Sequence, residues 1–148
     1  MCGEAPSCTI SLDGGAEPLP IQGGCGCRGD GGLAHVACRA EVATRKARGW
    51  HHGWAVCPTC GQRYTGAMDL GMSRALVRRM RTRPRDDYAR LAAEAHLGEL
   101  ARVLERLAEA ADVLARVLAA MKRVNGEDET NTLNAASALA VTHRRQGR

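Results

Sequence analysis

The sequence predicts two different parts, a small α+β finger that a bound metal holds together and an all-α region of helical hairpins after it. All seven cysteines lie within the first sixty residues, and six glycines fall between residues 23 and 32. The remainder is rich in alanine, leucine, arginine and glutamate, which are good helix formers. Because the chain has no phenylalanine and only 3% aromatic residues, the first part cannot build a large apolar core and needs another source of stability.

The cysteines and one histidine of the first part recur at spacings typical of metal ligands. In chain order they are Cys8, Cys25-x-Cys27, His35-x2-Cys38 and Cys57-x2-Cys60. Zinc prefers thiolate and imidazole ligands, and a closed structural site takes four of them. Seven candidates therefore predict two zinc sites, with one ligand missing or unusual. Gly61, directly after Cys60, suits the positive φ that a metal-binding turn often needs.

A disulfide scaffold and a catalytic thiol are the alternatives to zinc. The cysteine count is odd, Cys25 and Cys27 are too close for an ordinary disulfide, and no signal segment opens the chain. A reduced, intracellular location is therefore favoured, in the cytoplasm or alternatively the nucleus. A catalytic cysteine needs one activated thiol beside a base, whereas paired spacing favours ligation. His51 and His52 match no ligand position and are expected to be exposed.

The run C-x-C-x7-H-x2-C-x18-C-x2-C resembles ligands three to eight of a RING-CH finger, the RING variant with seven cysteines and one histidine. The resemblance covers the predicted finger domain, residues 1–66, from about residue 8 onward. It implies a cross-brace, in which the second and fourth ligand pairs share one zinc and the first and third pairs share another. The residues that it assigns to the complete site are Cys25, Cys27, Cys57 and Cys60.

The second site implied by the resemblance joins Cys8, His35 and Cys38, but its fourth position holds Ser11, whose neutral hydroxyl is a poor zinc ligand. Cys2 or a water could complete this site, or it binds zinc weakly or stays empty, so only one of the family's two zinc ions has a full ligand set here. The second ring nitrogen of His35 is expected to donate to a backbone carbonyl or a carboxylate, with Asp30 and Glu41 as candidates.

The resemblance also implies a function, since RING-type domains act as ubiquitin ligases that hold a ubiquitin-conjugating enzyme and a substrate together. The zinc is structural there, and the finger contributes no catalytic residue. The family's docking surface corresponds here to Ile10, Trp54 and Pro58, although Trp54 is equally suited to fill the small core. Many active members carry a basic residue directly after the last ligand, where this chain has Gly61. A zinc-stabilised adaptor without ligase activity therefore stays open.

The rest of the chain predicts four helices. One begins near residue 70 and ends near residue 83, within a connecting segment at 67–86, and the others cover 87–104, 107–122 and 130–145, with Thr130 as the last helix cap. Leucines recur at a spacing of 42, as Leu91 with Leu133 and Leu97 with Leu139. Residues 87–148 resemble about one and a half tetratricopeptide repeats of the kinesin-light-chain type, which implies a groove for a protein substrate or peptide.

The alternative for this region is a generic alanine-rich helical hairpin. Because solenoid repeats usually need about three copies, we expect a truncated chain or fragment whose last helix exposes Leu133, Leu139 and Val141.

The net charge of +5 could favour an acidic partner, phosphate or anionic lipid. Nucleic-acid binding is disfavoured, because the basic residues lack interleaved aromatic side chains and no known DNA-binding helix is evident. No apolar run reaches the roughly 20 residues of a membrane-spanning helix.

Overall fold

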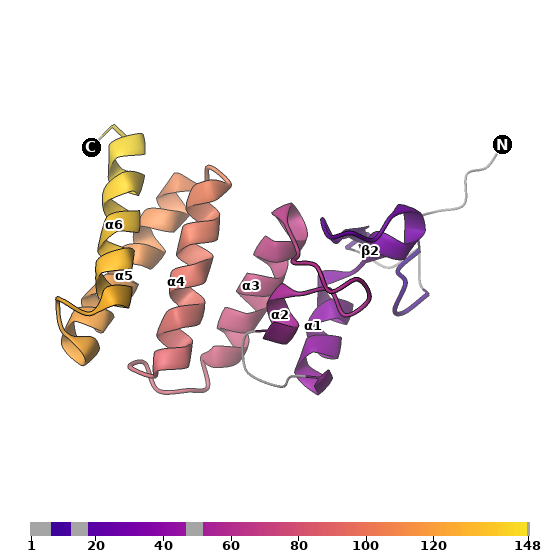
Figure 1. Cartoon of the computed structure of the whole chain (residues 1–148), viewed down its shortest axis with the longest axis horizontal. Helices are drawn as coiled ribbons and strands as arrows, with labels where there is room; N and C mark the ends of the chain where they lie inside the picture. Colours follow the sequence, from indigo (N-terminus) through magenta and orange to yellow (C-terminus); the bar gives the residue numbers. More distant parts are fainter. Residues whose placement is uncertain (1–6, 13–17, 47–51, 148) are drawn as a thin grey trace. The chain divides into compact units, whose positions relative to one another are not determined.

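The computed structural model describes residues 7–12, 18–46 and 52–147 (Figure 1). Cys2 and His51, which the sequence singled out, lie outside these ranges, and the side chain of His52 is not described. The chain divides into two compact units, Met1–Leu76 and Val77–Arg148. The described residues contain six α-helices and a sheet of two short strands, so the structure is mostly helical.

The first unit is built on an antiparallel pair of strands, β1 (Ile21–Gln22) and β2 (Leu33–Ala34), in which Ile21 lies opposite Ala34. A short 3-10 turn, η1 (Gly29–Gly32), leads into β2. Helix α1 (Val36–Lys46) follows, then the single turn α2 (His52–Ala55) and the first part of α3 (Gly66–Met80). Between α2 and α3 an isolated bridge pairs Val56 with Arg63.

The apolar core of the first unit is small, as the lack of phenylalanine predicts. Its larger buried side chains are Trp54, Tyr64, Met68, Met72 and Leu76. Trp54 is only 5% exposed, so this residue fills the core, in agreement with one of the two roles expected for it. Helix α3 lies so close to the start of α1 that a Cβ on Gly71 would stand 2.6 Å from Val36 Cγ2.

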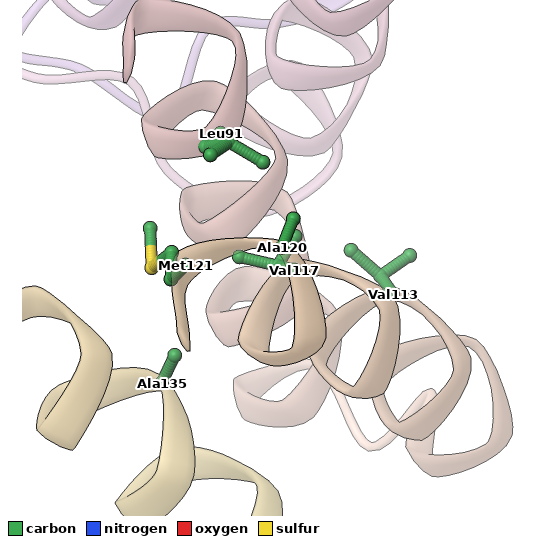
Figure 2. Close-up of a cluster of buried hydrophobic side chains, with 6 residues drawn as sticks. All are labelled: Leu91, Val113, Val117, Ala120, Met121 and Ala135. Carbon is green, nitrogen blue, oxygen red and sulfur yellow. The ribbon is translucent and has the colours of Figure 1, made fainter. Parts of the chain in front are cut away.

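The second unit consists of α4 (Tyr88–Val103), α5 (Leu107–Asn125) and α6 (Thr130–Arg145), with α4 and α6 both packed against α5 (Figure 1). Its core is a cluster of buried side chains from all three helices (Figure 2), namely Leu91, Val113, Val117, Ala120, Met121 and Ala135. Gly98 allows α4 and α5 to approach closely, because a Cβ there would lie 2.8 Å from Leu114 Cγ.

Helix α6 begins as the sequence predicts, but its cap is a different residue. The carboxylate of Glu129 accepts hydrogen bonds from the backbone N–H groups of Asn131 and Thr132, at 2.8 and 3.2 Å. Thr130, the expected cap, is instead the first helical residue. A carboxylate at this position is favourable because it also interacts with the positive end of the helix dipole.

The two leucines that recur at a spacing of 42 occupy different environments. Leu91 on α4 is 3% exposed in the core, whereas Leu133 on α6 is 54% exposed. Leu139 and Val141, the other apolar residues expected to be exposed on the last helix, are half-buried, and Val141 lines a pocket. The recurrence of residue types is therefore not matched by equal packing. No helix among the described residues is long and apolar enough to cross a membrane.

This asymmetry predicts the effect of the same substitution at the two positions. Leu91→Ala should lower the free energy of unfolding by about 2–5 kcal/mol, because it leaves a cavity in the core. The matched control Leu133→Ala should change it by no more than about 0.5 kcal/mol, because the side chain is largely in water. Thermal and urea unfolding of the two variants measure both values, and equal losses would contradict the packing described here.

Candidate metal centre

Four thiols converge in the first unit. The Sγ atoms of Cys25, Cys27, Cys57 and Cys60 all lie within 4.8 Å of one another, and those of Cys27 and Cys57 are 3.8 Å apart. A tetrahedral zinc with Zn–S bonds of about 2.3 Å requires its sulfurs to be about 3.8 Å apart. The donor chemistry and the spacing therefore both fit a zinc ion. All four cysteines are free thiols rather than disulfides.

Two short loops carry these thiols. Cys25 and Cys27 lie in the connection between β1 and β2, and Cys57 and Cys60 lie in the turn between the bridged residues Val56 and Arg63. In this turn the N–H of Gly61 donates to the carbonyl of Cys57 at 2.9 Å, and Gly61 has a φ of +72°. The positive φ expected at Gly61 is therefore confirmed.

Hydrogen bonds outside the thiols join the two loops. The Thr65 hydroxyl donates to the Gly24 carbonyl at 2.7 Å, and the Thr65 N–H donates to the Gly23 carbonyl at 3.4 Å. Sequence reasoning did not single out Thr65, because its role depends on a contact with a residue 41 positions away. Thr65 thus helps to hold the two loops side by side.

The thiols of this group influence one another's ionisation. Burial raises the pKa of Cys57, but hydrogen bonds from the N–H groups of Cys60 and Thr59 and from neighbouring thiols outweigh it and lower that pKa to about 6. Burial and the surrounding sulfurs raise the pKa of Cys27 to about 12. The thiolate of Cys57 therefore forms readily, while deprotonation of Cys27 beside it is unfavourable. A divalent cation among the sulfurs would remove that resistance.

A second group joins residues from three other places in the first unit. Cys8, His35 and Cys38 bring their ligand atoms within 4.8 Å of one another, and His35 Nδ1 lies 3.6 Å from Cys38 Sγ. This spacing is close to the about 3.6 Å that Zn–N and Zn–S bonds at a tetrahedral ion imply. The Thr9 N–H donates to the Leu33 carbonyl at 3.0 Å, which holds Cys8 beside the end of β2 and hence beside His35.

Ser11 lies at the position where a fourth ligand of this group is needed. Its hydroxyl is within hydrogen-bonding reach of the thiols of Cys8 and Cys38. Burial raises the pKa of Cys8, but hydrogen bonds from the N–H and hydroxyl of Ser11 and the N–H of His35 lower it to about 6. Ser11 therefore lies beside the predicted ligands Cys8 and Cys38 and offers a neutral hydroxyl rather than a thiolate.

The turn that carries Ser11 has the same backbone pattern as the Cys57–Gly61 turn. The N–H of Leu12 donates to the carbonyl of Cys8 at 2.8 Å, as that of Gly61 does to Cys57, and Leu12 also has a positive φ, at +59°. A non-glycine residue rarely adopts this conformation. Ser11 thus occupies in its turn the position that Cys60 occupies in the other.

The expected partner of His35 is not where the sequence placed it. His35 is buried, and its Nε2 has no hydrogen-bond partner among the described residues. Asp30 and Glu41 are both exposed, and Glu41 pairs with Arg45 one turn further along α1. Among the described residues neither a backbone carbonyl nor the carboxylate of Asp30 or Glu41 accepts a hydrogen bond from this nitrogen, so the prediction was wrong, because both carboxylates are directed toward solvent.

The three residues expected to form a docking surface differ in exposure. Ile10 is 37% exposed and Pro58 is exposed, whereas Trp54 is buried. Pro58 borders a pocket of about 280 Å³, which we call the Pro58 pocket. The residues that line it are Arg39, Val42, Ala43, Gly53, Val56, Cys57, Pro58, Gly61 and Tyr64.

Sequence reasoning also missed Arg39. It precedes Val42 and Ala43 by three and four positions, so all three share one face of α1, and that spacing is the signal that could have identified it.

Some of the arginines outside the first unit pair with nearby carboxylates. Arg83 lies 3.0 Å from Asp87 in the connection between α3 and α4, and Arg90 lies 3.1 Å from Glu94 on α4, where both side chains are largely buried. The positive charges of these arginines are therefore paired within the chain. They give no support to a nucleic-acid interface.

Comparisons with known proteins gave no match, whether to a family model, to a curated protein or to a solved structure. The chemistry of the site therefore rests on the residues themselves.

The first group should lose its zinc when one thiol is removed. We expect Cys57→Ala to release one zinc per chain and to unfold the finger, because structural zinc contributes on the order of 10 kcal/mol to the folding of small domains. Native mass spectrometry measures the zinc content and near-UV circular dichroism the packing of Trp54. Thr59→Ala is the matched control, since Thr59 lies exposed in the same turn and its N–H is retained; a variant Cys57→Ala that keeps its zinc and its spectrum would rule out this site.

The second group should bind zinc more tightly when its fourth corner becomes a thiol. Ser11→Cys should slow the loss of zinc to a chelator and raise the melting temperature, because a thiolate is a far better zinc ligand than a hydroxyl. Ser7→Cys is the control, since it adds a thiol one residue before Cys8, outside the turn.

An equal effect of both substitutions would contradict the assignment of Ser11 to the ligand position. Cys2→Ala tests the remaining alternative, because loss of a zinc in that variant would mean that Cys2 completes the group.

Proposed function

We propose that the first unit is a zinc-bound cross-brace finger of RING-CH type that recruits a ubiquitin-conjugating enzyme, as part of a ubiquitin ligase. The observation that carries this proposal is the alternation of the two ligand groups along the chain. Cys8 comes before Cys25 and Cys27, and His35 with Cys38 comes between those two and Cys57. Two metal sites whose ligand pairs alternate define a cross-brace, in which neither site can form from one continuous segment.

The Pro58 pocket is the surface that suits docking best in this proposal. It is lined by apolar side chains, including Val42, Val56 and Pro58, and it lies against the turn that carries Cys57. Small apolar pockets with a few polar groups are typical anchoring points in protein interfaces. A metal bound at the first group would fix the wall that contains Pro58, so docking would depend on zinc although zinc takes no part in the transfer chemistry.

The helices of the second unit would bind the protein substrate. A pocket of about 500 Å³ is lined by residues of α4, α5 and α6. Its lining combines apolar side chains such as Leu114, Met121 and Val141 with polar ones such as His96 and Asn134. This mixture suits a peptide segment, whose side chains need apolar contacts while its backbone needs hydrogen-bonding partners.

A zinc-stabilised adaptor without ligase activity is the second candidate, and the burial of Trp54 favours it. The docking surface implied by the family includes an exposed tryptophan, and this one is 5% exposed. Gly61 in place of a basic residue and Ser11 in a ligand position point the same way. In this alternative both pockets bind protein partners, and no ubiquitin is transferred.

An autoubiquitination assay distinguishes the two candidates. The zinc-loaded chain, incubated with activating enzyme, ubiquitin and a panel of conjugating enzymes, should form ubiquitin conjugates with at least one of them. Pro58→Ala should reduce the rate about tenfold, because truncation of an interface anchor typically costs more than about 1 kcal/mol. Pro18→Ala is the matched control, because Pro18 is an exposed proline of the same unit outside the pocket. If no conjugating enzyme of the panel gives ubiquitin conjugates, the ligase proposal is rejected in favour of the adaptor.

A further inference from the structure

Arg39 is a buried cation for which the described residues supply no carboxylate in its pocket. It lies in the first turns of α1, is 4% exposed, and its Nε has no hydrogen-bond partner among the described residues. None of the described residues that line the Pro58 pocket carries a carboxylate, and its one thiol, Cys57, belongs to the first ligand group. Burial of a charged group is strongly unfavourable unless the group is paired and hydrogen-bonded. A buried arginine of this kind is suited to a partner that supplies an anionic group.

The pocket around Arg39 is apolar and small. Val42 and Ala43 line it from the same face of α1, and Val56 and Pro58 line it from the chain that follows α2. Its volume of about 280 Å³ lies just below the lower end of the range for small-molecule sites, about 300 Å³. This space suits one inserted side chain rather than a nucleotide or another large ligand.

A carboxylate is the group that this environment would hold best. The planar guanidinium presents parallel N–H donors that match the two oxygens of a carboxylate, and such charge-assisted pairs are the strongest hydrogen bonds in proteins. The apolar walls would exclude water from the pair and would contact the methylene groups of a glutamate side chain. The phenol of Tyr64 also lines the pocket; burial raises its pKa to about 12, so it remains a neutral hydrogen-bonding group.

We propose that the Pro58 pocket is a carboxylate-binding site, in which Arg39 holds a glutamate or aspartate side chain of the protein that docks on the finger. This inference rests on the proposed docking function and adds to it the charge of the partner's anchoring residue. Arg39 selects an acidic anchor, and the pocket rejects an amide of the same shape because the guanidinium would then keep an unpaired charge.

The test is a titration of the full, zinc-loaded chain labelled with nitrogen-15. The probe is the capped peptide acetyl-Gly-Glu-Gly-amide, with acetyl-Gly-Gln-Gly-amide as its neutral counterpart and sodium chloride at equal ionic strength as the salt control. We expect saturable shifts of the backbone amide signals of Val42, Val56 and Tyr64 with the glutamate peptide. Binding of the glutamine peptide should be about tenfold weaker or not measurable, since loss of a charge-assisted hydrogen bond has about that effect.

Variants of two arginines on the same helix test the assignment to Arg39. Arg39→Met should abolish the shifts while keeping the zinc content and an equal or higher melting temperature, because an apolar side chain replaces an unpaired buried charge. Arg39→Lys keeps the positive charge but lacks the parallel N–H donors of the guanidinium, so it should weaken binding of the glutamate peptide. Arg45→Met removes a charge from an exposed position of α1, where the Arg45 side chain is 75% exposed, and should bind as the unmodified chain does.

Three outcomes would overturn the proposal. Equal shifts with both peptides or with chloride would show that carboxylate is not selected. Tighter binding of inorganic phosphate than of the glutamate peptide would assign the pocket to another anion. Loss of zinc or a lower melting temperature in Arg39→Met would mean that Arg39 stabilises the finger itself. Because no conjugating enzyme is present, this titration can succeed or fail independently of the autoubiquitination assay.

Discussion

The convergence of four thiols is the constraint on which the first unit depends. Cys25 and Cys27 are separated from Cys57 by about 30 residues, and the two strands of the first unit are each only two residues long. A sheet of this size is not stable alone, and Trp54 is the one tryptophan that the described residues contribute to the apolar core. A metal that joins the two loops would offset the entropy of closing that long segment, which the hydrogen bonds of Thr65 could do only in part.

The same convergence determines where a partner could bind. The Cys57–Gly61 turn forms one wall of the Pro58 pocket, and α1, which begins directly after His35, forms the other. The structural ligands and the pocket are therefore built from the same short segments. Arg39 directly follows Cys38 in the sequence. The first turn of α1 therefore positions both the candidate ligand Cys38 and the buried guanidinium of Arg39. Metal binding at the first group would therefore affect the binding of a partner in this pocket.

The sequence predicted the ligand groups and the helices better than it predicted side-chain environments. The close spacing within each ligand pair identified the candidate ligands, and the resemblance to a cross-brace finger divided them into two groups; helical periodicity located α4, α5 and α6 to within a few residues. The roles of Trp54, Glu41 and Leu133 depend on what packs against them from distant segments. Residue type alone does not contain that information, which is why Leu91 and Leu133 differ in burial although they recur at a regular spacing.

The Cys8–Leu12 turn separates the geometry of a metal-binding turn from its chemistry. Leu12 adopts a positive φ of +59° that costs a leucine on the order of 1 kcal/mol, although no cysteine precedes it as Cys60 precedes Gly61. A turn without a ligand at its fourth residue has no local reason to keep this conformation. The hydrogen bonds of Ser11 with the thiols of Cys8 and Cys38 supply a reason, because they hold this turn beside the second ligand group. The backbone of this segment therefore matches that of the Cys57–Gly61 turn, and the two turns differ in chemistry at Ser11, where a hydroxyl stands in place of a thiol.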